Sequence, residues 1–166
     1  MRDLLKLPVL ALGLSLGMAA LPVAHSDMDE GMIVLMHDNL KSADPEKHEW
    51  KMAGAVPYGM RVVMLYGDPT KPGPFVFRAR MSSGYKLPPH THPDERMVTV
   101  LKGTYWSGVG ERFNRRGTHE FPAGSMYVTK ANVPHFAWAQ TEVIIQEMGT
   151  GPDAGIHYVN PEDDPR

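Results

Sequence analysis

The stretch from Gly84 to Gly103, GYKLPPHTHPDERMVTVLKG, carries the strongest signal in this chain. Two histidines, His90 and His92, lie two residues apart after a pair of prolines, and a β-rich run closed by a glycine follows them. In an extended segment, residues two apart project from the same face, so both imidazoles can reach one cation. A third imidazole is available from His135, which opens another predicted strand.

These three histidines predict a metal site formed by His90, His92 and His135. Neutral imidazole suits iron, manganese, zinc, nickel or copper, so the identity of the divalent ion stays open. We interpret the histidines outside this pattern as packed or surface residues, namely His37, His48, His119 and His157.

The spacing of turn residues favours an all-β fold with little helix. Fifteen prolines and sixteen glycines separate short runs rich in Val, Ile, Phe and Tyr. In the clearest strand, 75–81, Phe75, Phe77, Ala79 and Met81 share one face, and Arg78 and Arg80 share the other. The other predicted strands are 32–36, 61–66, 97–101, 125–129, 135–139, 143–148 and 156–159. About eight such strands are typical of a sandwich or barrel.

The histidines and glycines together resemble the motifs of the cupins, in particular small single-domain exported bacterial cupins of the cupin type-2-like kind. The first cupin motif, G-x5-H-x-H-x(3,4)-E-x6-G, is matched by Gly84, His90, His92 and Gly103. The second, G-x5-P-x-G-x2-H-x3-N, is matched by Gly124 and His135, with Lys130, Asn132 and Ala139 at its other fixed positions. The resemblance implies a double-stranded β-helix, which is a jelly-roll barrel.

In cupins a glutamate joins the three histidines at the metal, but here its position carries Arg96, and Glu95 lies one residue earlier. Strand alternation puts Arg96 with Val98 and Val100 on one face and Glu95 on the other. Three alternatives stay open. Glu95 reaches the metal through a β-bulge, the histidines bind the metal alone, or no metal binds. Arg96 would oppose a cation, and it would also offer a planar fork to a carboxylate or phosphate.

The resemblance also suggests a function. One hypothesis is an exported metalloenzyme that oxygenates, isomerises or decarboxylates a small organic molecule, with carboxylate-bearing molecules among the candidates. Glu95 would be fourth ligand or general base, and Arg96 would orient the substrate, so both are candidate catalytic residues. Phe77 and Val98 are candidates for the pocket wall. The alternative is a non-catalytic ligand-binding or sensory cupin, with or without metal. Cupins commonly pair through an edge strand, which implies a homodimer.

Composition narrows the classes of partner. The chain has 166 residues, enough for one sizeable core, and 17 basic against 19 acidic residues with no basic run. Nucleic acid is therefore an unfavoured partner, and a small molecule is favoured. The chain has no cysteine, which rules out disulfides and thiolate chemistry.

The N-terminus predicts export. Residues 1–26 have basic Arg2 and Lys6, an apolar stretch and a small-residue end at Ala24-His25-Ser26, the pattern of a secretory signal peptide. The competing reading is an uncleaved membrane anchor. After cleavage we expect no stable membrane span and a periplasmic or secreted location. Residues 27–60 would form an N-terminal strand and an irregular surface segment, 61–160 the barrel, and 161–166 an exposed tail.

Overall fold

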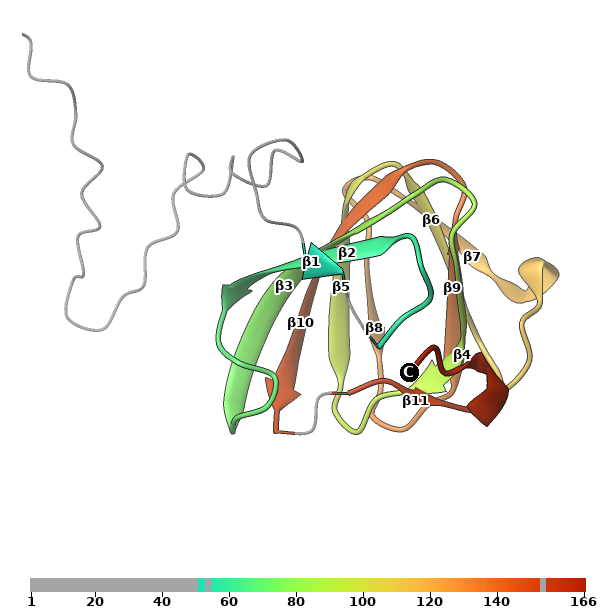
Figure 1. The fold of residues 1–166 in the computed structure, drawn as a ribbon. Coiled ribbons are helices and arrows are strands. Elements are labelled where there is room, and N and C mark those ends of the chain that lie inside the picture. Colours follow the sequence, from blue (N-terminus) through green and yellow to red (C-terminus); the bar gives the residue numbers. More distant parts are fainter. Residues whose placement is uncertain (1–50, 53–54, 153–154) are drawn as a thin grey trace, which may run out of the picture. The chain divides into compact units, whose positions relative to one another are not determined.

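Two antiparallel sheets face each other in the computed structural model, which describes residues 51–52, 55–152 and 155–166 (Figure 1). The six-stranded sheet has the order β1 (Lys51–Met52), β2 (Met60–Tyr66), β3 (Gly73–Met81), β10 (Val143–Gly151), β5 (Arg96–Lys102) and β8 (Met126–Thr129). The five-stranded sheet has the order β11 (His157–Tyr158), β4 (Lys86–Thr91), β9 (His135–Ala139), β6 (Thr104–Val109) and β7 (His119–Pro122). This is the jelly-roll barrel that the sequence predicted.

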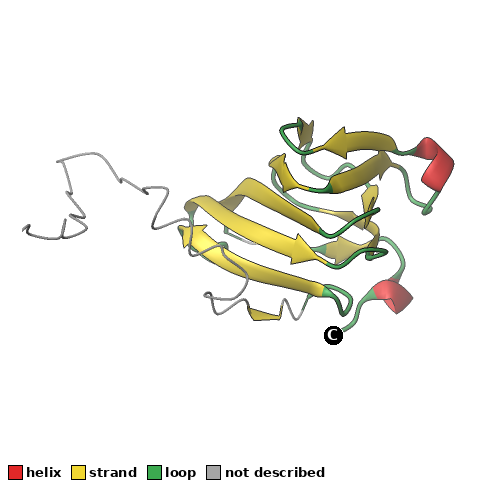
Figure 2. Cartoon of the chain, turned by 90° about the horizontal axis from the view of Figure 1, so that it is seen from above, coloured by secondary structure: helices red, strands yellow, loops and turns green. Residues whose placement is uncertain are grey.

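Helix is almost absent from the described residues. Two 3-10 turns, η2 (Arg115–Gly117) and η3 (Pro161–Asp163), lie at the periphery, as Figure 2 shows. Among these residues no helix has the length and apolar character needed to cross a membrane. The predicted signal peptide, the predicted strand 32–36 and most of the segment 27–60 lie outside the described residues.

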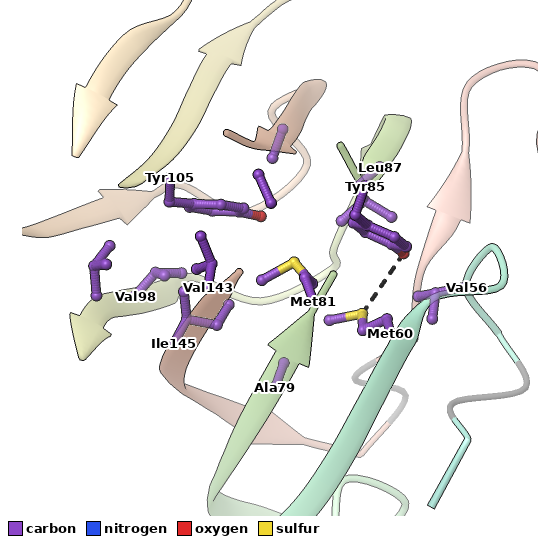
Figure 3. Packing of buried hydrophobic residues seen from close by; sticks show 13 residues of the cluster. Val56, Met60, Ala79, Met81, Tyr85, Leu87, Val98, Tyr105, Val143 and Ile145 are labelled. Atoms are coloured by element: carbon purple, nitrogen blue, oxygen red, sulfur yellow. Dashed lines mark hydrogen bonds between the residues drawn. The ribbon is translucent and has the colours of Figure 1, made fainter. Parts of the chain in front are cut away.

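The core lies between the two sheets and follows from side-chain alternation along the strands. In β3, Phe75, Ala79 and Met81 are almost fully buried, while Arg78 and Arg80 lie on the outer face, as predicted. Val98 and Val100 of β5 also point inward. Figure 3 shows residues from both sheets in this cluster, including Val98, Val143 and Ile145 from one sheet and Leu87 and Tyr105 from the other.

Four strands were missed by the sequence analysis, the two-residue β1 and the longer β4, β6 and β7, and the longer three depart from typical strand composition. β4 contains Pro88 and Pro89, which cannot donate to a sheet ladder. β6 includes Ser107 and Gly108, and β7 is a four-residue polar edge strand. Pairing with β9 holds β4 and β6 in place, so tertiary contacts override their weak intrinsic preference.

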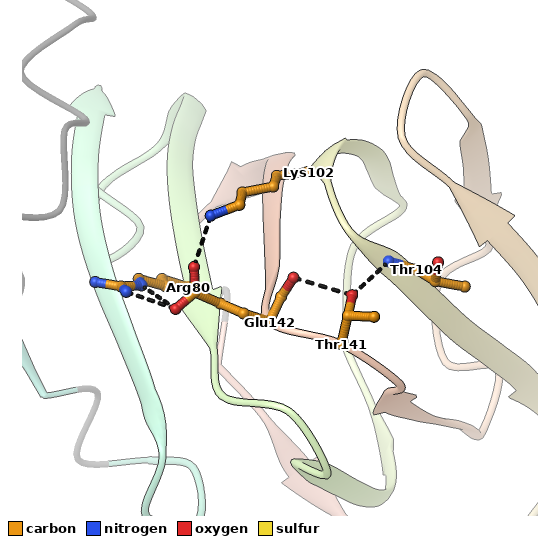
Figure 4. A network of polar contacts seen from close by, with 5 residues as sticks. All are labelled: Arg80, Lys102, Thr104, Thr141 and Glu142. Carbon is orange, nitrogen blue, oxygen red and sulfur yellow. Dashed lines mark hydrogen bonds and ion pairs between the residues drawn. The ribbon is translucent and has the colours of Figure 1, made fainter.

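A polar network joins the strands at one rim of the barrel (Figure 4). Glu142, just before β10, accepts hydrogen bonds from Arg80 at 2.5 Å and from Lys102 at 2.8 Å. Thr141 accepts the backbone N–H of Thr104 at 3.0 Å. Gly103 must be glycine, because its φ is +80° and a Cβ there would collide with the backbone of Glu142. This first-motif glycine therefore lets the β5–β6 turn pack closely against the start of β10.

Candidate metal centre

Strand pairing brings the three predicted histidines together inside the barrel. His90 on β4 lies opposite His135 on β9, with ring centroids 4.2 Å apart. His92 follows β4, and its ring lies 5.0 Å from that of His90 and 5.4 Å from that of His135. All three side chains are buried, and one ligand atom from each lies within 4.8 Å of the others. The predicted three-imidazole cluster is therefore present.

The two prolines before His90 have a structural role in this arrangement. Leu87 pairs with Ala137 and His90 pairs with His135, so β4 uses one residue more than β9 between the two pairs. Such a β-bulge changes the alternation of the strand that contains it. As a result Leu87 and His90, three residues apart, both face the barrel interior.

Backbone carbonyls fix the orientation of each imidazole ring. The Nδ1 atoms lie 2.7 Å from the oxygen of Pro88 for His90, 2.8 Å from that of Gly155 for His92, and 3.0 Å from that of Val133 for His135. A carbonyl oxygen can only accept, so each Nδ1 carries the proton and donates it. Each Nε2 then keeps its lone pair, which is the arrangement found in metal-binding histidines.

Burial keeps these rings neutral at pH 7. It lowers the pKa of His90 well below the usual range, and His135 and His92 lower it further. Burial, aided by Arg96, lowers the pKa of His92 to about 3, and burial also lowers the pKa of His135. A metal ion binds the neutral form of imidazole, so the protein environment favours the form that binds. The residues present therefore fit a divalent metal ion.

Arg96 enters the barrel beside the histidines, on the inner face with Val98 and Val100, as strand alternation predicted. It is 3% exposed, and two carboxylates bind it. Its Nε donates to Oδ1 of Asp94 at 2.8 Å, and its Nη1 donates to Oε1 of Glu147 at 2.7 Å. Its guanidinium carbon also lies 5.0 Å from the ring centre of Phe75.

Glu147 is the site residue that sequence reasoning missed. It lies on β10 between Phe77 of β3 and Val98 of β5, and it is 9% exposed. Burial raises the pKa of Glu147, and the positive charge of Arg96 opposes that change. The available signal was alternation, because Val143 and Ile145 are clear core residues and Glu147 continues their face.

A cavity of about 220 Å³ adjoins the histidines. Phe77 and Val98, the two predicted wall residues, line it together with Arg96 and Glu147. The rest of its wall is mostly apolar and includes Met60, Val62, Met64, Leu87 and Ile156, with the phenol groups of Tyr105 and Tyr127. The interior therefore combines a possible ion site with space for a small organic molecule.

Solved structures with the same architecture match this chain at low sequence identity. The polyketide cyclase RemF from Streptomyces resistomycificus matches with a TM-score of 0.54 and 19% identity, covering 68% of this chain and 78% of that one. An RmlC-like cupin from Shewanella frigidimarina gives 0.53 and 17%, with 65% and 87% covered. KdgF from a Halomonas species gives 0.52 and 16%, with 66% and 92% covered. The chain has the cupin fold. No family model matches the sequence, and a search of curated proteins found no match.

The second cupin motif tolerates one of its departures, Asn132, for a structural reason. Asn132 stands where the motif has glycine, and its φ is +60°, a conformation that asparagine adopts more readily than most residues. Its backbone N–H donates to the carbonyl of His92 at 2.7 Å. The turn that precedes His135 is therefore joined directly to the first cupin motif.

The structure departs from the expectation that Glu95 is the fourth metal ligand or the general base. Glu95 lies on the outer side of β5, with its side chain 43% exposed and 2.6 Å from Nζ of Lys130. No bulge at this point turns it inward, because β5 and β8 pair regularly from Arg96↔Thr129 to Thr99↔Met126. Glu95 is therefore not placed as a metal ligand or general base in this structure, and the inward position belongs to Arg96.

The predicted role of Arg96 also changes. Two donors of its guanidinium are already bound by carboxylates of the same chain. Part of the planar fork that the sequence assigned to a substrate carboxylate is thus engaged internally, since Nε and Nη1 each donate to a carboxylate. Asp94 and Glu147 also offset its positive charge, which reduces the repulsion expected toward a cation.

Proposed function

We propose that this protein binds one divalent transition-metal ion through His90, His92 and His135 and acts on a small organic molecule held in the adjoining cavity. The observation that carries the proposal is the shared geometry of the histidines. Each is buried, each donates Nδ1–H to a backbone carbonyl, and one ring nitrogen from each lies within 4.8 Å of the others. When bound, the ion would supply Lewis-acid polarisation or an activated water.

This chain's own residues would define the space around the ion. Phe77, Val98 and Leu87 would exclude water from an apolar ligand, since burial of apolar surface favours binding. Arg96 and Glu147 are the charged groups of the wall, and they are hydrogen-bonded to each other. The candidate reactions are the three that the sequence suggested, namely oxygenation, isomerisation and decarboxylation. We do not retain a carboxylate on the ligand, because Arg96 is engaged internally.

Metal analysis tests the proposal. Untagged protein should contain about one equivalent of a transition metal after purification or reconstitution, since three fixed imidazoles suffice for a catalytic type of site. The His90→Ala variant should lose this metal, while His119→Ala, which changes an exposed histidine on β7, should keep it. Less than about a tenth of an equivalent of any transition metal, with failed reconstitution, would contradict a metal-dependent function.

Ligand binding without turnover is the second candidate function, favoured by the largely apolar lining of the cavity. Native mass spectrometry of the metal-loaded protein can separate the two. A compound that copurifies and is released unchanged after long incubation under air supports simple binding, whereas conversion supports an enzyme.

Export remains a proposal based on residues 1–26. Expression of the full chain in a Gram-negative host should give a periplasmic protein that begins near Asp27, measured by N-terminal sequencing. A full-length, membrane-associated product would favour the uncleaved anchor instead.

We also propose a homodimer. Met148, Met97 and Val128 lie side by side on the outer face of β10, β5 and the edge strand β8, and they are 39%, 39% and 42% exposed. A row of large apolar side chains that reaches an edge strand is suited to self-association. Light scattering should give twice the monomer mass for the wild type and the monomer mass for Met97→Glu. Equal masses for both proteins would remove this face as the interface.

A further inference from the structure

A buried group of three charges lies beside the largely apolar cavity, and two of its members, Arg96 and Glu147, line it. Arg96 bridges Asp94 and Glu147, and the side chains of the three residues are 3%, 12% and 12% exposed. Burying charges carries a desolvation cost that their attraction often fails to recover, so such a group is weak support for a purely stabilising role. Its position beside the histidines points instead to the ligand.

The charges do not balance. One guanidinium faces two carboxylates, so the group is negative by one unit when all three residues are ionised. A carboxylate-bearing ligand entering this wall would meet a cation that is already neutralised and a net negative charge. The interaction is strong at short range, because the surroundings are apolar and largely exclude water.

The two carboxylates have different surroundings. Asp94 uses both oxygens within the protein, since Oδ1 accepts from Arg96 and Oδ2 accepts the backbone N–H of Thr150 at 2.7 Å. Glu147 lines the cavity, and its hydrogen bond from Arg96 uses Oε1. A carboxylate can accept about four hydrogen bonds, so Glu147 retains capacity for a donor in the cavity.

The size of the cavity limits the ligand. An apolar cavity of about 150 Å³ can hold benzene. The cavity of about 220 Å³ therefore has room for roughly one substituted ring. Most of the ligand would contact apolar side chains such as Met60, Val62 and Phe77, which favour an uncharged molecule.

We propose that Glu147 sets the ligand class of this cavity. The ligand is a neutral, largely apolar molecule of about one ring that carries a hydroxyl group, and its O–H donates to the carboxylate of Glu147. Carboxylate-bearing molecules of the same size are rejected, because Glu147 repels them and occupies Arg96. The inference rests on the proposed function, since it takes the cavity beside the histidines as the ligand site.

Two matched probes test this inference, 4-ethylphenol and 4-ethylbenzoate, which differ mainly in hydroxyl against carboxylate. Calorimetric titration into full-length metal-free wild-type protein should show tighter binding of the phenol, and the metal is left out because a bound Zn²⁺ would itself attract the carboxylate. In Glu147→Gln, the phenol should bind about 10-fold more weakly and the benzoate about 10-fold more tightly, since a charged acceptor is lost and Arg96 loses one carboxylate partner.

Asp94→Asn is the matched control. Like Glu147→Gln, this variant neutralises one carboxylate partner of Arg96, but it leaves the carboxylate of Glu147 in the cavity. The phenol should then bind within about 2-fold of the wild type, because an acceptor outside the cavity contributes no hydrogen bond to the ligand. A role of Glu147 in folding alone would weaken both probes by similar factors, and that result would overturn the proposal.

Tighter binding of the benzoate by the wild-type protein would also overturn it, and this comparison needs no variant if Glu147→Gln fails to fold. A separate zinc reconstitution distinguishes failure of the proposed metal function from failure of this inference. If the wild type binds no zinc, the proposed metal function fails, while the preference between the probes is measured on the metal-free protein in either case.

Discussion

Nη1 of Arg96 lies 2.7 Å from Oε1 of Glu147, across the neighbouring strands β5 and β10. Both residues lie in the barrel wall. Arg96 occupies the position at which the first cupin motif has its metal-binding glutamate. The carboxylate that lines the cavity beside Arg96 therefore comes from β10, 51 residues later in the chain, and it is joined to the first motif through Arg96.

Loss of one imidazole should abolish tight metal binding. In His135→Ala, we expect the metal affinity to fall by more than about 100-fold, which exceeds the effect typical of outer-shell partners. Competition with a chromophoric chelator measures the affinity. The control His119→Ala should match the wild type, and an unchanged affinity in His135→Ala would remove this histidine from the site.

Removal of Glu95 should leave the metal site intact. Its carboxylate is paired with Lys130 on the outer surface. We therefore expect metal affinity within about 2-fold of the wild type and a loss of stability of no more than about 1 kcal/mol, as for an exposed ion pair. Chelator competition and urea unfolding of Glu95→Ala measure both quantities. A clear fall in metal affinity would restore Glu95 as a ligand.

Removal of Arg96 should destabilise the protein strongly. Arg96→Met leaves two largely buried carboxylates without their cation, and breaking a buried pair typically costs about 3–5 kcal/mol. Urea unfolding of the metal-free protein measures the loss. The double variant Arg96→Met, Glu147→Met should recover part of it, because one uncompensated charge is removed. A double variant no more stable than Arg96→Met would argue against this electrostatic cause.

Gly149 of β10 should not tolerate a side chain. A Cβ at this position would lie less than 3.0 Å from atoms of Asp94, Phe75 and Arg96. We expect Gly149→Ala to cost about 1–3 kcal/mol, as in other overpacked cores. Thr150→Ala is the control, since that side chain is exposed. Thermal unfolding of both variants gives the comparison, and equal midpoints would mean that the charged group shifts without cost.

The low pKa of His92 predicts how stability depends on pH in the metal-free protein. The folded state keeps His92 neutral down to about pH 3, whereas the unfolded chain takes up a proton near pH 6.5. The unfolded state therefore binds more protons in this window, and the free energy of unfolding falls as pH is lowered from 6.5. Burial is the main cause of the low pKa of His92. Glutamine does not titrate, so the stability of His92→Gln should lack the pH dependence that His92 contributes.

The stability advantage of wild type over His92→Gln should thus shrink by up to about 1.4 kcal/mol for each pH unit below 6.5. Urea unfolding of both proteins between pH 7.5 and pH 5 measures it. The difference between the curves removes the contributions of the other titrating groups, including Glu147, whose raised pKa acts in the opposite direction. A difference that does not vary with pH would contradict the shift at His92.

Local patterns in the sequence indicated an all-β fold and the pair His90 and His92, and the resemblance to the cupin motifs added the jelly-roll topology and His135. Alternation in β3 and β5 assigned their buried faces correctly, and the spacing of His90 and His92 placed both rings inward. These features depend on residues close in the chain, so strand geometry alone determines them. The same alternation placed Arg96 inside and Glu95 outside, although the motif left the ligand role of Glu95 open.

Only the tertiary structure decided what surrounds Arg96. Its partner Glu147 lies on β10, and the pairing order β3-β10-β5 that joins them is a property of the whole sheet. Likewise, Pro88 and Pro89 weaken the strand signal of β4, and it is pairing with β9 that sets the bulge and the position of His90. The sequence by itself thus determined most of the strands, the inner faces of β3 and β5, and the three imidazoles. Contacts between distant strands determined the charge of the cavity wall, because electrostatic partners are set by distance in space.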